Sequence, residues 1–218
     1  MKRVKLYSYW RSTAAYRVRI ALNIKGVPYD YIPVHLIKDG GQQHADDYVA
    51  LNPSHMVPTV VLDDGTVLTQ SLAIMDYLEQ TIAENPLLPT APNDRAQVMA
   101  AAHILAVDTH PVNNLRVVQH LDSAFGASQQ DTVNWMLNWT GKGLTAFNQM
   151  VRPDTPYAFC EQPTLADICL VAQLYNARRW KQDLTDLVRL VEIEQNCLKL
   201  KAFADAQPHL QPDAEPQK

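Results

Sequence analysis

The chain has 218 residues, which is enough for one large domain or two small domains with a sizeable buried core. Hydrophobic residues make up 47% of it and charged residues 19%, which is ordinary for a globular protein. The formal net charge of -4 lacks the basic excess typical of nucleic-acid binding, and no apolar run reaches the roughly 18 residues of a membrane span. Because the N-terminal residues also lack the apolar core of a secretory signal, we expect a cytoplasmic protein with no nucleic-acid or membrane partner.

The first predicted elements form a β-α-β unit. Residues 2–8 alternate between apolar and polar side chains, which predicts a strand, and residues 12–25 change to helical spacing. Gly26-Val27-Pro28 is typical of a helix end, because glycine often follows the last turn and proline cannot continue it. Residues 29–34 then predict a second strand.

A polar loop and a β-β-α unit follow. Residues 35–56 are irregular, with one short helix expected over 46–51. The turn Asp63-Asp64-Gly65 separates two short apolar runs, which predicts a hairpin. Ser71 is a candidate cap for a helix that reaches residue 82.

Three prolines between residues 85 and 92 break both periodicities and predict an interdomain linker. Domains are therefore expected over 1–84 and 93–218. In the second, helical spacing covers roughly 93–121, 130–152, 164–180 and 185–206, with a kink expected at Pro111. Thr164 and Asp167 have capping-box spacing. Residues 208–218 contain three prolines and little apolar surface, so we expect a disordered tail.

Cysteine usage gives no sign of a redox or metal centre. Cys160, Cys169 and Cys197 form no close pair and lie among helical patterns. We expect buried, reduced thiols and no bound metal.

The junction of the first strand and first helix is the best candidate site. A helix N-terminus presents unpaired N–H groups and partial positive charge, so an anion can bind there. Ser12 adds a hydroxyl donor, and Arg11 and Arg17 add positive charge. On this local pattern alone, an ordinary helix cap is the more frequent explanation.

A domain of this pattern resembles the thioredoxin-like fold, but its first loop has no cysteine, so any sulfur must come from a ligand. Motifs along nearly the whole chain resemble zeta-class glutathione transferases, the family that includes maleylacetoacetate isomerases. They are Tyr7-Ser8-Tyr9-Trp10-Arg11-Ser12, Arg17-Val18-Arg19-Ile20-Ala21-Leu22, Gly40-Gly41-Gln42-Gln43, Ala50-Leu51-Asn52-Pro53, Val57-Pro58-Thr59, Gln70-Ser71-Leu72-Ala73-Ile74, Pro163-Thr164-Leu165-Ala166-Asp167 and Asn176-Ala177-Arg178-Arg179-Trp180. The resemblance implies an α/β thioredoxin-like domain followed by an all-α domain, with glutathione as cofactor.

The resemblance also assigns glutathione contacts in the first domain. Ser12 matches the serine that donates to the glutathione sulfur, and Thr13 adjoins it in the same loop. Val57 matches the residue whose backbone pairs with the cysteinyl part, before a cis peptide at Pro58. The remaining contacts are Gln43, on the glycine side, and Gln70 and Ser71, at the γ-glutamyl end.

In the second domain, the resemblance assigns His110, Asn114 and Arg116 to the border of the glutathione and substrate sites. Without it, His110 fits a core histidine and Arg116 a surface charge equally well. Arg11 and Arg179 would act in catalysis, since guanidinium groups suit a dicarboxylate substrate. Arg178 is expected to face solvent.

The implied activity is isomerisation of maleylacetoacetate to fumarylacetoacetate in tyrosine and phenylalanine catabolism, with the glutathione thiolate adding reversibly to the cis double bond. The resemblance also implies a homodimer. Ala14 departs from the family, where many members carry cysteine, and so leaves the substrate range open. The alternatives are a maleylpyruvate isomerase, a transferase that conjugates small acidic electrophiles, and a non-catalytic module that binds partner proteins.

Overall fold

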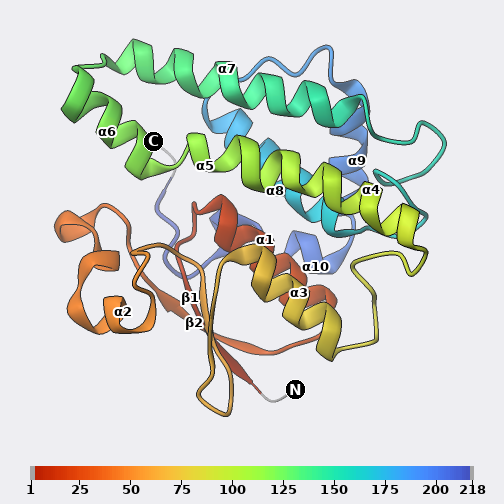
Figure 1. Ribbon diagram of the computed structural model, residues 1–218, viewed down its shortest axis with the longest axis horizontal. Coiled ribbons are helices and arrows are strands. Elements are labelled where there is room, and N and C mark those ends of the chain that lie inside the picture. Colours follow the sequence, from red (N-terminus) through yellow and green to blue (C-terminus); the bar gives the residue numbers. More distant parts are fainter. Residues whose placement is uncertain (1–2, 217–218) are drawn as a thin grey trace. The chain divides into compact units, whose positions relative to one another are not determined.

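A computed structural model describes residues 3–216 of the chain (Figure 1). The described residues form two compact units. Unit 1 contains the chain up to Pro86 together with the segment from Leu200 onward, and unit 2 contains Leu87–Lys199. The expected change of domain over residues 85–92 therefore corresponds to a division between Pro86 and Leu87, but the C-terminal segment lies in the first unit.

Unit 1 is built on a four-stranded mixed sheet with the order β2-β1-β3-β4. Its strands are β1 (Val4–Ser8), β2 (Tyr29–Pro33), β3 (Thr59–Val61) and β4 (Val67–Thr69). Strand β1 pairs with β2 in parallel, Leu6 opposite Tyr31, and with β3 in antiparallel, Leu6 opposite Val60. The β-α-β and β-β-α units predicted from the sequence are confirmed.

Helices α1 (Thr13–Ile24) and α3 (Ser71–Thr81) pack against each other in unit 1, and α10 (Lys201–Ala204) packs on α1 (Figure 1). Helix α1 is buried along most of its length, including the polar side chains of Arg17 and Arg19. The short helix α2 (Asp46–Leu51) has the predicted bounds and follows the 3₁₀ turns η1 (Lys38–Gly40) and η2 (Gln42–His44).

Unit 2 contains helices and no strand among the described residues, and its helices are joined by irregular segments such as 149–164. Helix α8 (Leu165–Arg179) is buried along almost its whole length, and α4 (Pro92–His103) and α9 (Val188–Leu198) pack against it. Helix α6 (Leu115–Phe125) precedes the long helix α7 (Gln129–Asn148).

The predicted kink at Pro111 is a larger interruption than expected. After α4 the chain widens into the π-helical segment η3 (Ile104–Thr109), where the N–H of His110 donates to the carbonyl of Leu105. Pro111 lies in the short helix α5 (His110–Val112), and an extended Asn114 precedes α6. The wider turn accommodates a residue that lacks an N–H and crowds the preceding turn. The predicted helix over 93–121 is therefore divided into several pieces.

The predicted capping box at the start of α8 is present and buried. The Asp167 carboxylate accepts hydrogen bonds from the Thr164 N–H at 2.7 Å, the Thr164 hydroxyl at 2.8 Å and the Ala158 N–H at 2.7 Å. Burial raises the pKa of Asp167, and these hydrogen bonds act in the opposite direction.

The prediction of a disordered tail is wrong for residues 208–216. Pro208–Leu210 form the 3₁₀ turn η4, and the buried Gln211 side chain donates to the carbonyls of Asp205 and Gln207. Asp213 and Glu215 bind residues near the first strand. Composition could not predict these contacts, because they depend on groups that are distant in the sequence. The last part of the predicted tail, 217–218, lies outside the described residues.

Candidate functional site

The turn between β1 and α1 places Ser12 at the start of the helix. Ser12 is the N-cap, with extended backbone angles of φ -69 and ψ 118, and its hydroxyl oxygen accepts the N–H of Ala15 at 3.2 Å. A hydroxyl that accepts in this way still has its own proton to donate. The first N–H groups of the helix, including that of the buried Thr13, have no partner within the helix. The turn is therefore equipped to bind an anion.

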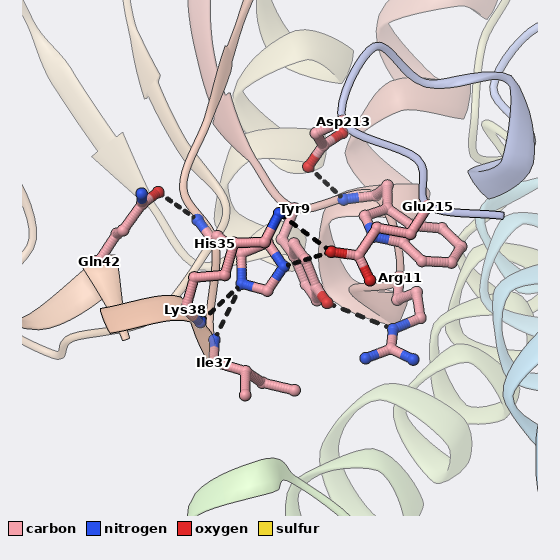
Figure 2. A network of polar contacts seen from close by, with 9 residues as sticks. Tyr9, Arg11, His35, Ile37, Lys38, Gln42, Asp213 and Glu215 are labelled. Atoms are coloured by element: carbon pink, nitrogen blue, oxygen red, sulfur yellow. Dashed lines mark hydrogen bonds and ion pairs between the residues drawn. The ribbon is translucent and has the colours of Figure 1, made fainter. Parts of the chain in front are cut away.

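Arg11 lies beside two aromatic rings at the same turn. Its guanidinium carbon is 5.1 Å from the centre of the Trp10 ring and 5.9 Å from that of Tyr9, and its Nε donates to the Tyr9 hydroxyl at 3.3 Å (Figure 2). Tyr9 and Trp10 are buried while Arg11 is half-buried. The rings stabilise the cation and restrict its orientation.

Val57 precedes a cis peptide bond at Pro58, as predicted. It is buried in a cluster with Tyr9, Trp10, Val34 and Tyr48. The segment that leads into β3 is thus packed against the turn that leads to Ser12.

Gln70 and Ser71 begin helix α3, but their roles at its start differ from the prediction. Gln70, not Ser71, is the N-cap, and it has a left-handed backbone with φ 66, which is uncommon for a residue other than glycine. The Ser71 hydroxyl accepts from Arg17 Nε at 3.1 Å and from Nη2 at 3.0 Å, so its own proton remains to be donated. Arg17 therefore supports Ser71, a contact that the sequence analysis missed.

Gln43 is buried in the loop before α2. Its Nε2 donates to the Leu36 carbonyl at 3.3 Å, while Oε1 is buried and has no hydrogen-bond partner among the described residues. A buried acceptor without a donor is unfavourable, so this oxygen suits a ligand that brings an N–H or O–H group.

The other predicted residues lie in unit 2. His110 begins α5, and Asn114 is the N-cap of α6, where its side chain accepts the Arg116 N–H at 3.3 Å. Arg179 ends α8 and donates to the Asn176 side chain at 3.3 Å. A common substrate site for Arg179, Arg116 and Arg11, the last in unit 1, stays a prediction.

Arg178 does not simply face solvent. It forms a two-pronged ion pair with Glu194 of α9, with both nitrogen to oxygen distances at 2.6 Å. Burial raises the pKa of Glu194, and the Arg178 guanidinium counteracts this shift. The pair links α8 to α9, so its role is structural.

No group of three or more histidine, cysteine, aspartate or glutamate side chains suited to a metal ion occurs within residues 3–216. None of the three cysteines forms a disulfide; Cys169 and Cys197 are buried and Cys160 is half-buried. In the same part of the chain, none of the helices has both the length and the apolar character needed to cross a bilayer.

The sequence and the structure are similar to those of known proteins. Residues 11–81 match the family model of the glutathione S-transferase N-terminal domain. The chain is 46% identical to a maleylacetoacetate isomerase of Rhizobium meliloti over 206 residues, which are 93% of this chain and 95% of that protein.

Two solved structures cover nearly all of the chain. A zeta-class maleylpyruvate isomerase superposes with a TM-score of 0.93 at 40% identity, over 97% of this chain and 100% of that one. A maleylacetoacetate isomerase of Methylobacterium extorquens, solved with malonate and glutathione, gives 0.92 at 36% identity with the same coverage. The chain therefore belongs to the glutathione transferase family, in the zeta class with the maleylacetoacetate and maleylpyruvate isomerases.

Proposed function

We propose that this protein is a glutathione-dependent isomerase that converts maleylacetoacetate to fumarylacetoacetate in the catabolism of tyrosine and phenylalanine. The observation that carries the proposal is the Ser12 hydroxyl, which caps α1 through its oxygen and keeps its proton for a ligand. Full-length similarity to maleylacetoacetate isomerases supports the substrate.

The residues of unit 1 fit glutathione. Ser71 and Gln70, at the start of an 11-residue helix, suit the α-carboxylate and amine of the γ-glutamyl end. The partnerless Gln43 Oε1 suits a donor on the tripeptide, and the extended chain before Pro58 offers Val57 for backbone pairing. With Ser12 and Thr13 near the sulfur, each part of the tripeptide has a candidate contact.

Bound glutathione supplies a thiolate that adds to the double bond of the substrate and leaves after the bond has rotated. The contribution of the protein is to keep that sulfur ionised. The Ser12 hydroxyl would donate a hydrogen bond to the thiolate, and the partial positive charge at the start of α1 would favour the anion over the thiol. Ser12 thereby raises the fraction of glutathione that is ready to react at neutral pH.

The arginines would hold the carboxylates of the substrate and balance the charge that develops on its carbonyl oxygen. We assign this role to Arg11 and Arg179, because guanidinium binds carboxylates through two hydrogen bonds. We assign His110, Asn114 and Arg116 to the edge of the glutathione and substrate sites. The malonate bound to the Methylobacterium extorquens relative supports a preference for diacids.

Maleylpyruvate is the second candidate substrate. The chain is as similar in structure to a maleylpyruvate isomerase as to a maleylacetoacetate isomerase, with TM-scores of 0.93 and 0.92, and Ala14 stands where many members of the class carry cysteine. The two substrates share the maleyl group and differ in the acyl portion, so the same residues serve both. Conjugation of small acidic electrophiles would use the same thiolate, without the elimination step.

We further propose that the protein works as a homodimer in the cytoplasm. Its three cysteines form no disulfide, which is consistent with a reducing compartment. Light scattering should give twice the chain mass of 24.5 kDa. A value of one chain mass at micromolar concentration would exclude the dimer.

The proposal is tested by an assay of wild-type protein, Ser12→Ala and Ser12→Thr with both acids, with and without glutathione. Loss of one hydrogen bond to a charged group should lower kcat/KM roughly tenfold or more in Ser12→Ala. Ser12→Thr keeps a hydroxyl and should retain more activity. An Ser12→Ala variant within twofold of wild type would refute the role of Ser12, and isomerisation that needs no glutathione would refute the proposed function.

A further inference from the structure

The peptide groups of Trp10 are held from two sides by groups that lie far apart in the sequence. Its N–H donates to the Asp213 carboxylate at 3.1 Å, and its carbonyl accepts from Arg19 Nη2 at 3.2 Å. Trp10 is two residues before Ser12, and the Ser12 N–H donates to the Tyr9 carbonyl at 2.9 Å to close the turn. The Trp10 peptide groups are therefore part of the same hydrogen-bonded turn that carries Ser12.

Arg19 donates to this turn from the core of unit 1. Its side chain is fully buried, and besides Trp10 it donates to the Ser8 hydroxyl at 3.3 Å and to the Ala206 carbonyl at 3.0 Å. Its guanidinium also lies 5.2 Å from the centre of the Tyr16 ring. Arg19 thus binds the end of β1, the turn and the C-terminal segment at once, which leaves the turn little freedom on that side.

The Asp213 carboxylate accepts hydrogen bonds from the turn and from the sheet. One carboxylate oxygen accepts the Trp10 N–H (Figure 2). The other accepts the Tyr31 hydroxyl of β2 at 2.6 Å. Burial and the Asp213 carboxylate raise the pKa of Tyr31, so the phenol stays protonated and keeps donating. Asp213 is therefore itself fixed by the sheet and can act as a rigid acceptor.

Ala214 and Glu215, which follow Asp213, also contact residues of unit 1. Glu215 binds His35 Nε2 at 3.2 Å and Lys38 Nζ at 3.1 Å (Figure 2). His35 Nδ1 accepts the N–H groups of Ile37 and Lys38, so Nε2 carries the proton and donates to Glu215. Ala214 packs on the cluster that contains Tyr9, Trp10 and Val57.

We propose that Asp213 is a positioning residue for Ser12, and that the C-terminal residues 213–215 form part of the scaffold of the glutathione site. Asp213 touches neither substrate nor cofactor in this role; it fixes the peptide that sets the direction of the Ser12 hydroxyl. The inference rests on the proposed function in so far as Ser12 binds the glutathione thiolate. Because a hydrogen bond to a charged group weakens steeply with poor geometry, a loosened turn should reduce thiolate stabilisation.

The test compares Asp213→Ala and Asp213→Asn with a control, Asp205→Asn. Asp205 lies eight positions before Asp213, outside the proposed scaffold residues, and pairs with Lys201 at an exposed position. Two properties are measured in each protein. The pKa of bound glutathione is followed by the ultraviolet absorbance of its thiolate, and the exchange of the Trp10 amide proton is followed by nuclear magnetic resonance.

We expect Asp213→Ala to speed exchange of the Trp10 amide, to raise the pKa of bound glutathione toward that of free glutathione, and to raise the KM for glutathione about tenfold. Asp213→Asn keeps one carbonyl acceptor and should fall between wild type and Asp213→Ala. It also carries the test if the alanine variant fails to fold. Asp205→Asn should match wild type within twofold in every measurement.

The outcomes distinguish the positioning role of Asp213 from the proposed function of the protein. If the Trp10 amide exchanges faster in the Asp213 variants while the pKa of bound glutathione is unchanged and the KM for glutathione stays within twofold, the positioning role is wrong and the proposed function stands. An unchanged exchange rate in folded Asp213→Ala also overturns the inference. If wild-type protein fails to bind glutathione or to lower its pKa, the proposed function fails, and the positioning role fails with it.

Discussion

At the scale of single residues, two capping boxes with the same arrangement differ in burial. Asp167 is fully buried at the start of α8 and accepts three hydrogen bonds, whereas Asp131 is exposed at the start of α7 and binds the N–H and hydroxyl of Ser128. Water can replace the lost acceptor at the exposed box. It cannot do so at the buried one, where removal leaves donors unsatisfied.

We therefore expect Asp167→Ala to lower the free energy of unfolding by about 3 kcal/mol or more, since three buried donors lose their acceptor. Asp167→Asn retains an oxygen acceptor and should cost less. Asp131→Ala is the matched control and should produce a clearly smaller loss. Urea unfolding followed by circular dichroism measures all three, and equal losses at the two boxes would contradict the argument from burial.

At the scale of elements, a buried ion pair joins the ends of α1 and α3. Lys25, the C-cap of α1, has a fully buried side chain whose Nζ lies 2.8 Å from the Glu79 carboxylate of α3. The same ammonium donates to the carbonyl of Ile82, the C-cap of α3, at 2.8 Å and to that of Glu84 at 3.2 Å. Lys25 thus pairs with the Glu79 carboxylate and also donates to backbone carbonyls at the end of α3, which have no partner within the helix.

Removal of that lysine takes away the ammonium group that lies 2.8 Å from the Glu79 carboxylate and that donates to the carbonyls of Ile82 and Glu84. We expect Lys25→Ala to destabilise the protein by about 3–5 kcal/mol, the usual cost of breaking a buried pair from one side. The double variant Lys25→Met with Glu79→Leu replaces both charges by apolar groups and should recover much of that loss. Thermal and urea unfolding check both variants, and a double variant no more stable than Lys25→Ala would contradict the proposed electrostatic cause.

At the scale of the whole molecule, unit 1 is discontinuous in the sequence. The segment from Leu200 onward returns to it, with Phe203 fully buried and the Ala202 carbonyl accepting from Asn23 of α1. The buried guanidinium of Arg19 also depends on the Ala206 carbonyl. The first domain of the chain is therefore incomplete without the last residues.

This connectivity predicts the behaviour of fragments. A fragment of residues 1–86 should fail to fold stably, because Arg19 and the apolar surface under Phe203 would be left without partners. The same fragment joined through a flexible linker to residues 200–218 should gain cooperative thermal unfolding. A cooperative, native-like transition in residues 1–86 alone would contradict this prediction.

Local chemistry explains what the sequence could predict. Strand alternation, helical spacing, the Ser12 cap and the Thr164 capping box each depend on residues a few positions apart, so the β-α-β unit, the hairpin and the cap were recognised correctly. The cis bond before Pro58 was predicted through the family resemblance. The site roles of Val57, Gln70, Ser71 and the second-domain residues rest on that same resemblance.

The sequence by itself predicted the strands of unit 1, the helical character of the second half and, through its motifs, the family, because these depend on local patterns. Only the tertiary structure decided that the proline-rich tail is ordered, that Arg17 supports Ser71 and that Arg178 pairs with Glu194. The reason is separation along the chain: Asp213 binds Trp10 across 203 positions, and Arg19 binds Ala206 across 187. Periodicity carries no information at such distances, and the contacts form only when the packed core brings the two groups together.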